Sequence, residues 1–156
     1  MAAVGLLPPV GGWAPASFDP VSEGPNPASL LDQMPFSVAC GVKLTSATAS
    51  MVTGELEWAP LRCTSGGLLH GGALMLLADT LGGICAFLNL PEGAGTATIE
   101  SKTNFFRGVR QGRVHATTHP LHIGRTTIVV QTDVSDGEDR RVAQVTQTQA
   151  ILSGAG

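Results

Sequence analysis

The spacing of polar and apolar residues changes most clearly after residue 70. From Gly71 or Gly72 to about Asn89 nearly every position is apolar or small. This pattern predicts a long helix that other elements enclose on nearly all faces. At 1.5 Å per residue the helix would be roughly 25–27 Å long. The run Pro91-Glu92-Gly93 ends it.

Strand-like alternation of polar and apolar residues follows this helix and also precedes it. Four strands are predicted after the helix, over about residues 96–106, 113–122, 125–135 and 141–152. Their joints carry turn residues, at Arg110-Gln111-Gly112, Ile123-Gly124 and Asp136-Gly137. Before the helix, the segment from Phe36 to Trp58 holds two strand-like stretches. In one of them, Ala47–Glu57, polar and apolar residues roughly alternate. Residues 60–67 have the composition of a loop.

Two strands, one long helix and four strands predict an α+β domain in which a curved antiparallel sheet wraps the helix. We expect this single domain to cover residues 28–156. Residues 1–27 hold six of the ten prolines and little charge, which is typical of an irregular tail. A short helix is predicted from Pro27 or Ala28 to Met34.

Composition narrows the class of protein. The net charge of -3 gives no electrostatic reason to expect nucleic-acid binding. The apolar run 68–90 contains Asp79, His70 and several glycines, which favours a buried core helix over a membrane span. The first basic residue is Lys43, so no signal or transit peptide is indicated. We expect a cytoplasmic protein whose widely spaced cysteines, Cys40, Cys63 and Cys85, are reduced thiols.

Asp79 is the one charged residue between Arg62 and Glu92. A carboxylate in such an apolar segment is costly to bury unless it is paired or functional. Two interpretations remain open at this point. Asp79 is a catalytic group, or it is a structural carboxylate satisfied by backbone or hydroxyl partners such as Thr80.

The glycine-rich segment from Gly66 to Gly72 meets the start of the long helix. Free N–H groups and the positive end of the helix dipole make such a start suitable for an oxyanion or a polarised carbonyl. The alternative is a tight loop that packs closely. Nine residues separate His70 from Asp79, roughly 13 Å along the axis. If both serve one site, a second subunit must supply one of them, which predicts a dimer with antiparallel helices.

The remaining reactive side chains give weaker indications. His70 suits a general base, a hydrogen-bond donor or a satisfied loop residue. His115 and His119 share a strand face, but His122 points away and no carboxylate lies at ligand spacing, so no metal site is expected. Cys63 near His70 could be a thiol nucleophile, but no third group orients the pair.

The motif Leu69-His70-Gly71-Gly72 followed by Ala78-Asp79 resembles that of the hotdog-fold acyl-CoA thioesterases. Within them it is most similar to the PaaI-like and Arthrobacter-type 4-hydroxybenzoyl-CoA thioesterase group. Three later stretches support the resemblance, which covers about residues 35–153: Asn104-Phe105-Phe106-Arg107, His122-Ile123-Gly124-Arg125-Thr126 and Ala150-Ile151-Leu152.

The resemblance implies a hotdog fold and a homodimer with joined sheets, usually paired into a homotetramer, with active sites at the dimer interface. It implies hydrolysis of an acyl-CoA to a free acid and coenzyme A, with aryl, arylacetyl or medium-chain acyl groups and no cofactor. Asp79 would be the nucleophile or the general base toward water. The Gly71 N–H of the facing subunit would polarise the thioester carbonyl, and His70 would orient the thioester or stabilise the loop.

The resemblance also implies a set of substrate-binding residues. Of the four arginines Arg107, Arg110, Arg113 and Arg125, we favour Arg107 and Arg125 for the coenzyme A phosphates, because they lie in the matching motifs. Phe105 and Phe106 alternate, so one is expected in the core and the other along a channel. The full set is Gly72, Thr80, Gly83, Thr98, Phe105, Phe106, Arg107, Gly124, Arg125 and Thr126.

Two positions depart from the family pattern. Thr64 replaces an Asn or Gln near the thioester, and Gly83 replaces a Ser or Thr that helps to hold water. We expect Thr80 or Thr98 to compensate. These departures keep a non-catalytic acyl-CoA or acyl-carrier binding module open as the main alternative. A dehydratase of the same fold and a structural oligomer without ligand are further alternatives.

Overall fold

A computed structural model of the chain describes residues 27–152. The predicted tail lies outside the described residues except for its last position. The described part consists of one six-stranded sheet, one long helix and short helical segments, which confirms the predicted α+β class.

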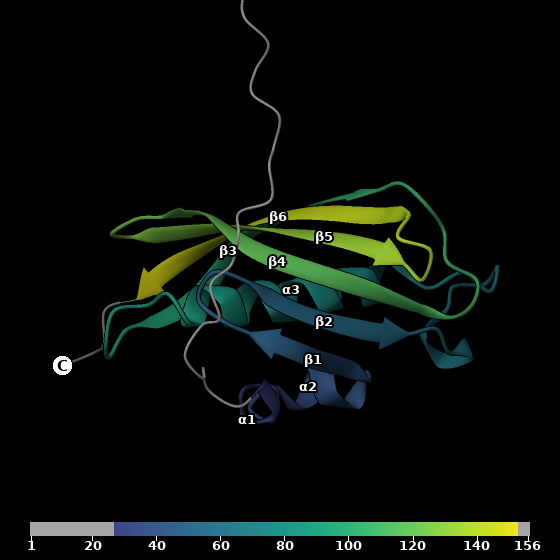
Figure 1. Cartoon of the computed structure of the whole chain (residues 1–156), viewed down its shortest axis with the longest axis horizontal. Helices are drawn as coiled ribbons and strands as arrows, with labels where there is room; N and C mark the ends of the chain where they lie inside the picture. The colour runs from purple at the N-terminus through teal and green to yellow at the C-terminus, as the bar shows by residue number, and fades with distance from the viewer. Residues whose placement is uncertain (1–26, 153–156) are drawn as a thin grey trace, which may run out of the picture.

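All neighbouring strands of the sheet are antiparallel, in the order β1-β2-β4-β5-β6-β3. The helix α3 lies against one face of the curved sheet, and α1 and α2 lie beside β1 (Figure 1). The elements are α1 Pro27–Leu31, α2 Pro35–Ala39, β1 Val42–Ala47, β2 Val52–Glu57, the 3-10 turn Pro60–Arg62, α3 Gly71–Phe87, β3 Gly95–Phe105, β4 Arg113–Ile123, β5 Thr127–Asp136 and β6 Arg141–Leu152.

The core lies between α3 and the inner face of the sheet. Leu77 and Leu81 of α3 are completely buried. A methyl group on Gly54 of β2 would come within 2.9 Å of the Leu81 side chain. The absence of a side chain at Gly54 therefore lets α3 approach the sheet closely. Burial of apolar surface from the strands completes the core, with Val52, Leu56, Val114, Ile128, Val130, Val134, Val142 and Val145.

One stripe of α3 is not covered by the other residues that the structure describes. The exposed positions Gly72, Met75, Asp79 and Phe87 recur at helical spacing along it. The prediction that α3 is enclosed on nearly all faces is therefore wrong for the described part of the single chain, and Asp79 is exposed there. The physical reason is that the described sheet curves around α3 without closing, and β3 forms its edge beside this stripe.

Two predictions for the segment that precedes α3 are also corrected. The alternating stretch Ala47–Glu57 is not one strand, because a turn over residues 48–51 separates β1 from β2. Thr48 closes this turn with its hydroxyl, which donates to the Met51 carbonyl and accepts from the Met51 N–H, both at 3.0 Å. The region near Phe36 forms the short helix α2, and Pro35 at its start is favoured there.

The end of α3 is fixed by a side-chain amide. Asn89 Nδ2 donates to the Cys85 carbonyl at 2.8 Å and to the Ala49 carbonyl at 2.7 Å. The last turn of the helix is thereby tied to the β1–β2 turn. None of the described helices is long and apolar enough to cross a membrane.

The turn between β5 and β6 is organised by Asp136. Its carboxylate accepts from the backbone N–H groups of Glu138 and Arg140 at 3.0 and 3.1 Å and from Arg140 Nε at 2.8 Å. Burial would raise the pKa of Asp136, but the hydrogen bonds from Arg140 and Glu138 and the Arg140 charge outweigh it and lower the pKa below its ordinary value.

Replacing this carboxylate, Asp136→Asn, should lower the unfolding temperature at pH 7. Because the folded-state pKa is lowered, the carboxylate stabilises the fold above its unfolded-state pKa, and this contribution is lost as pH falls through the folded-state value. The difference from the wild type should therefore shrink in thermal unfolding measured toward pH 3. Glu138→Gln, which alters an exposed ion pair with Arg140, is the control and should show little change. An Asp136→Asn difference that is constant with pH contradicts this assignment.

Candidate functional site

The Asp79 carboxylate is held by a network of side-chain amides and a hydroxyl. Its Oδ1 accepts from Gln147 Nε2 at 2.5 Å and from the Thr98 hydroxyl at 3.3 Å. Thr98 Oγ1 itself accepts from Gln147 Nε2 at 3.1 Å and from Gln149 Nε2 at 2.9 Å. A hydroxyl that accepts from two amides has its single proton left for the carboxylate. The network therefore suits an ionised Asp79.

Gln147 reaches Asp79 only because α3 has a glycine at position 82. Gln147 lies on β6 and is 1% exposed. Any side chain at Gly82 would overlap Gln147 Oε1. This oxygen has no hydrogen-bond partner within the described chain. Close packing of α3 on β6 is thus achieved at the cost of an unpaired amide oxygen.

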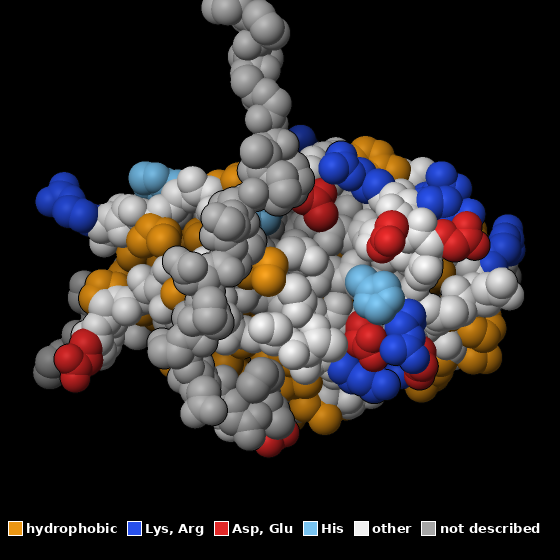
Figure 2. Space-filling view, in the orientation of Figure 1, with side chains coloured by type: hydrophobic (Ala, Val, Ile, Leu, Met, Phe, Trp, Pro, Cys, Tyr) orange, Lys and Arg blue, Asp and Glu red, His pale blue; other side chains and the backbone are white. Residues whose placement is uncertain are grey.

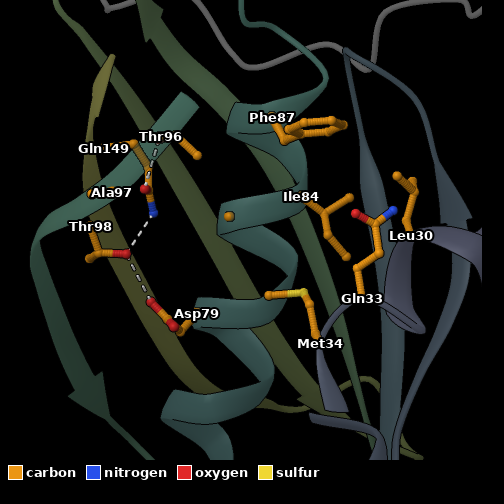
Figure 3. A pocket seen from close by; sticks show the side chains of 11 residues that line it. Leu30, Gln33, Met34, Asp79, Ile84, Phe87, Thr96, Ala97, Thr98 and Gln149 are labelled. Carbon is orange, nitrogen blue, oxygen red and sulfur yellow. Dashed lines mark hydrogen bonds between the residues drawn. The ribbon is translucent and has the colours of Figure 1, made fainter. Parts of the chain in front are cut away.

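A cavity of about 280 Å³ lies beside Asp79. Figure 3 shows its two sides, with Thr96, Thr98 and Gln149 across from the side chains of α1 and of the segment that follows it. Gly83 of α3 lines the cavity, and a methyl group there would meet no atom within 4 Å. The apolar lining comes from Leu30, Met34, Ile84, Phe87 and Ala97. The cavity can hold an apolar group next to the carboxylate.

The start of α3 offers one free backbone donor. His70 is the N-cap residue, and its Nδ1 accepts from the Gly72 N–H at 2.8 Å. The N–H groups of Ala73 and Leu74 donate to the His70 carbonyl. Gly71 N–H has no acceptor among the described residues. Of the first-turn donors, Gly71 is therefore the one available to an oxyanion.

These two features lie in different cavities of one chain. A second cavity of about 280 Å³ is lined by His70 and Gly72 together with Phe36, Leu61 and Cys63. Asp79 does not line it, and its own cavity does not include His70 or Gly72. The single chain thus carries a carboxylate in one place and a free helix N-terminus in another.

Three of the predicted substrate-binding residues have other surroundings than expected. Thr80 is buried, with its hydroxyl bonded to Ser37 at 2.8 Å and to the Leu76 carbonyl at 2.7 Å, so it cannot replace the residue missing at Gly83. Phe105 and Phe106 are each about half exposed, so neither lies in the core. Phe105 packs over Gly71. Of the two threonines expected to compensate for Gly83, Thr98 therefore contacts Asp79, whereas Thr80 is buried away from it.

The arginines divide into paired and unpaired residues. Arg113 bonds Glu55 and Glu57, and Arg110 donates to the Gly66 carbonyl. Within the described chain Arg107 and Arg125 form no ion pair. These two are therefore the arginines free to meet an external anion.

Arg107 and Arg125 lie at opposite ends of the sheet. Phe105, two residues before Arg107, pairs with residue 143 of β6, whereas Thr127, two residues after Arg125, pairs with residue 150. These β6 positions are roughly 24 Å apart. Gly124 and Thr126 flank Arg125 in the β4–β5 turn, so they too lie away from Arg107.

The remaining candidates are placed as follows. Thr64 is exposed in the loop before α3, where its carbonyl accepts from the Gly67 N–H. The Cys63 thiol donates to the Ala59 carbonyl at 3.1 Å. Burial raises the pKa of the Cys85 thiol to about 11, which makes it a poor nucleophile. Cys40 and Cys63 are only partly buried.

No group of three or more potential metal ligands gathers in the part of the chain that the structure describes.

Several residues of the site were not identified from the sequence. They are Gln147 and Gln149 on β6, Thr96 on β3, and Leu30, Gln33 and Met34 near the N-terminus of the domain. The usable signal was the position of the glutamines. They share a strand face with Val145, so they point toward the core, where an amide needs a partner.

Three comparisons with known proteins bear on this geometry. The family profile described as "Thioesterase superfamily" matches residues 66–143. A Vibrio cholerae protein named as an esterase is 39% identical over 106 residues, which are 68% of this chain and 67% of that protein. The 1,4-dihydroxy-2-naphthoyl-CoA hydrolase of Escherichia coli is 35% identical over 86 residues, 55% of this chain and 63% of that protein.

Among solved structures, that of a mutant thioesterase from Pseudomonas aeruginosa is similar with a TM-score of 0.79 at 26% identity. The likeness covers 83% of this chain and 96% of that one.

Adjacent glycines give a matched test of the Gly82–Gln147 contact. Gly83→Ala should stabilise the fold by up to about 1 kcal/mol, because alanine favours a helix and the space is open. Gly82→Ala should destabilise it by about 1–3 kcal/mol, because the methyl group displaces the buried Gln147 amide or overpacks the interface. Urea unfolding measures both. Equal effects of the two substitutions would show that Gly82 is not required for the contact.

Proposed function

Because the chain belongs to the thioesterase superfamily and is a thioester hydrolase, we propose that it hydrolyses an acyl-CoA at a site shared by two subunits. Its fold is the hotdog fold predicted from the sequence. The observation that carries the proposal is the exposed Asp79 carboxylate beside an apolar cavity, separated within one chain from the free Gly71 N–H.

Asp79 supplies the base or the nucleophile. As a general base it removes a proton from water as the water oxygen bonds to the thioester carbonyl carbon. As a nucleophile its own oxygen bonds to that carbon, and water then hydrolyses the mixed anhydride. In both routes the C–S bond breaks, and coenzyme A leaves as a thiolate that takes up a proton. Gln147 and Thr98 hold the carboxylate by its Oδ1, which leaves Oδ2 for this task.

The Gly71 N–H supports the electrophile. Its position at the start of α3 places it at the positive end of the helix dipole. A thioester oxygen gains negative charge as the tetrahedral intermediate forms, and a fixed N–H donor stabilises that charge. His70 holds this turn by capping the Gly72 N–H, so its main effect is on the orientation of the Gly71 donor.

A dimer brings these groups together. Asp79 and Gly71 of one chain are eight residues apart on the same helix, roughly 12 Å along its axis, and Gly71 does not line the cavity beside Asp79. Within the described part of the chain, the stripe of α3 that carries Asp79 is uncovered and β3 is an open edge beside it. A second copy on this surface covers apolar side chains and supplies its Gly71 to Asp79.

The proposed acyl group is aryl, arylacetyl or of medium chain length. The cavity beside Asp79, about 280 Å³, is slightly smaller than a typical ligand pocket and mostly apolar. It suits the acyl part alone, with the coenzyme outside. The related Escherichia coli protein, by its name, hydrolyses a thioester of an aromatic acid, which supports an aryl group. The coenzyme A phosphates would meet Arg107 of one subunit and Arg125 of the other, since a two-fold axis brings opposite sheet ends together.

Asp79→Asn should lower kcat by about 100-fold to 10,000-fold, because the amide neither accepts the proton nor attacks the carbonyl. The assay measures thiol release from a panel of acyl-CoA substrates. Glu92→Gln, an exposed carboxylate in the α3–β3 loop, is the control and should keep full activity. Near wild-type turnover of Asp79→Asn would refute the role of this carboxylate, and acyl-CoA binding without thiol release by the wild type would favour a binding module.

Gly83→Val should narrow the acyl cavity, because the position is open and faces the cavity. We expect kcat/KM for an arylacetyl-CoA or octanoyl-CoA to fall by about 10-fold or more, while that for acetyl-CoA changes little. The short substrate on the same variant serves as the control. An equal loss for all acyl groups would place the acyl chain elsewhere.

A further inference from the structure

One wall of the cavity beside Asp79 is polar, although most of the cavity is apolar. Thr96 and Thr98 of β3 and Gln149 of β6 form this wall (Figure 3). Gln149 is only 1% exposed. A buried side-chain amide costs free energy unless its hydrogen bonds are satisfied. An apolar residue at position 149 would line an acyl cavity at lower cost, which indicates a second role for the amide.

The polar side chains of this wall form a continuous line of hydrogen bonds that ends at Asp79. The Thr96 hydroxyl donates to Gln149 Oε1 at 3.1 Å, and Gln149 Nε2 donates to the Thr98 hydroxyl at 2.9 Å. Thr98 in turn donates to Asp79 Oδ1 at 3.3 Å. Figure 3 shows these bonds as dashed lines. Thr96, Gln149 and Thr98 thus form a relay between the cavity wall and the carboxylate.

The direction of the relay depends on how the Gln149 amide is oriented. An ionised Asp79 only accepts hydrogen bonds, and Gln147 donates both to it and to Thr98 through the same nitrogen. Gln147 thus occupies one lone pair of the Thr98 hydroxyl. The single Thr98 proton is directed at Asp79 only if Gln149 presents its nitrogen, and not its oxygen, to the same hydroxyl.

A reversed Gln149 amide would withdraw the Thr98 proton from the carboxylate. Gln149 Nε2 lies closer to the Thr98 hydroxyl than Asp79 Oδ1 does, so an oxygen in its place would compete for that proton. Thr96 opposes the reversal because its hydroxyl donates to the Gln149 oxygen. The Thr96 proton is shared with the Ala150 carbonyl, at 2.9 Å. The charge on Asp79, which strengthens the bond from Thr98, completes the selection.

We propose that Thr96 and Gln149 are positioning residues, which act through Thr98 to hold the Asp79 carboxylate in the orientation that hydrolysis requires. The inference rests on the function proposed above. Thr98 holds Oδ1 from β3 and Gln147 holds it from β6, so the carboxylate is kept from rotating. A reacting group that moves by about 1 Å can lose about 100-fold in rate.

The same residues could instead only shape the cavity, because Thr96 and Gln149 both line it. The two roles differ in the substrates that respond to a substitution. A residue that only contacts the acyl chain affects long acyl groups and leaves acetyl-CoA, with its short acyl group, nearly unaffected. A residue that positions Asp79 affects kcat for every acyl group, because the same carboxylate hydrolyses all of them.

The first experiment replaces the relay residues by apolar residues of similar size. Gln149→Met and Thr96→Val should each lower kcat by roughly 10-fold, because both interrupt a line of hydrogen bonds to a charged group. The loss should be the same for acetyl-CoA and octanoyl-CoA in the thiol-release assay, and KM for acetyl-CoA should change little. Thr96→Ser keeps the hydroxyl and should recover most of the activity.

Thr148→Val is the matched control. Thr148 lies next to Gln149 on β6 and points to the opposite face of the sheet. Its substitution should keep full activity, although it also removes a threonine hydroxyl near the site. A loss confined to octanoyl-CoA in Gln149→Met and Thr96→Val would overturn the proposal and leave both residues as cavity lining. Equal losses in Thr96→Ser and Thr96→Val would overturn it as well.

A second experiment needs no substrate and uses the folded protein. The Gln147 side-chain amide donates to Asp79 and Thr98, so its nitrogen and proton resonances in a two-dimensional NMR spectrum report on the surroundings of the carboxylate. Thr96→Val alters the far end of the relay and should shift these resonances, because hydrogen bonds in a chain polarise one another. Thr148→Val should not shift them. Unchanged Gln147 amide resonances in Thr96→Val would refute the relay.

The two proposals fail in different ways. If the wild type releases no thiol from any acyl-CoA while Thr96→Val still shifts the Gln147 amide resonances, the acyl-CoA assignment is wrong and the relay to the carboxylate stands. If thiol release is normal and Asp79→Asn abolishes it, but Gln149→Met and Thr96→Val keep the wild-type kcat, the function stands and the positioning role is wrong.

Discussion

The contact between Gly82 on α3 and the buried amide of Gln147 on β6 fixes the position of the Asp79 carboxylate. Gly82 admits the amide, the amide donates to Asp79, and Thr98 adds a second donor from β3. Because the other sides of α3 are buried, Asp79 lies on the stripe of the helix that residues 27–152 leave exposed. The cavity beside Asp79, its closeness to the edge strand β3 and the proposed sharing of the site all depend on this placement of the helix.

Much of the fold could be predicted from the sequence because its signals are local. Alternation with period two and turn residues at Gly112, Gly124 and Gly137 marked the strands after the helix within a few residues. The β1–β2 turn was missed because Thr48 and Ser50 continue the alternation while the Thr48 side chain closes a turn. A pattern of side-chain polarity does not contain that hydrogen bond.

The site was only half predictable for a similar reason. Asp79 is conspicuous as a lone charge in an apolar segment, and Gly71 as the start of a helix. Gln147 and Gln149 are less conspicuous, because β6 carries polar residues on both faces and the only indication that their face is buried is that they share it with Val145. Thr80 was misassigned because it is adjacent to Asp79 in sequence, whereas about 100° of helical rotation turns it toward Ser37.

The proposed sharing of the site between subunits would also keep its two halves reactive. A carboxylate within reach of a free N–H at its own helix start would bond to it and occupy both groups before any substrate arrived. The distance along α3 prevents this in the single chain. Under the proposed function, the apolar cavity and the free donor therefore become one site only on assembly.

The open edge of β3 has a consequence for how the protein behaves as it is diluted. If the edge that completes the site is also the edge that joins the subunits, hydrolysis and assembly are governed by one dissociation equilibrium. Turnover per chain then rises with protein concentration until the strands are paired. By mass action the same pairing raises the temperature of unfolding. The concentration of the protein then determines both the activity per chain and the thermal stability of the fold.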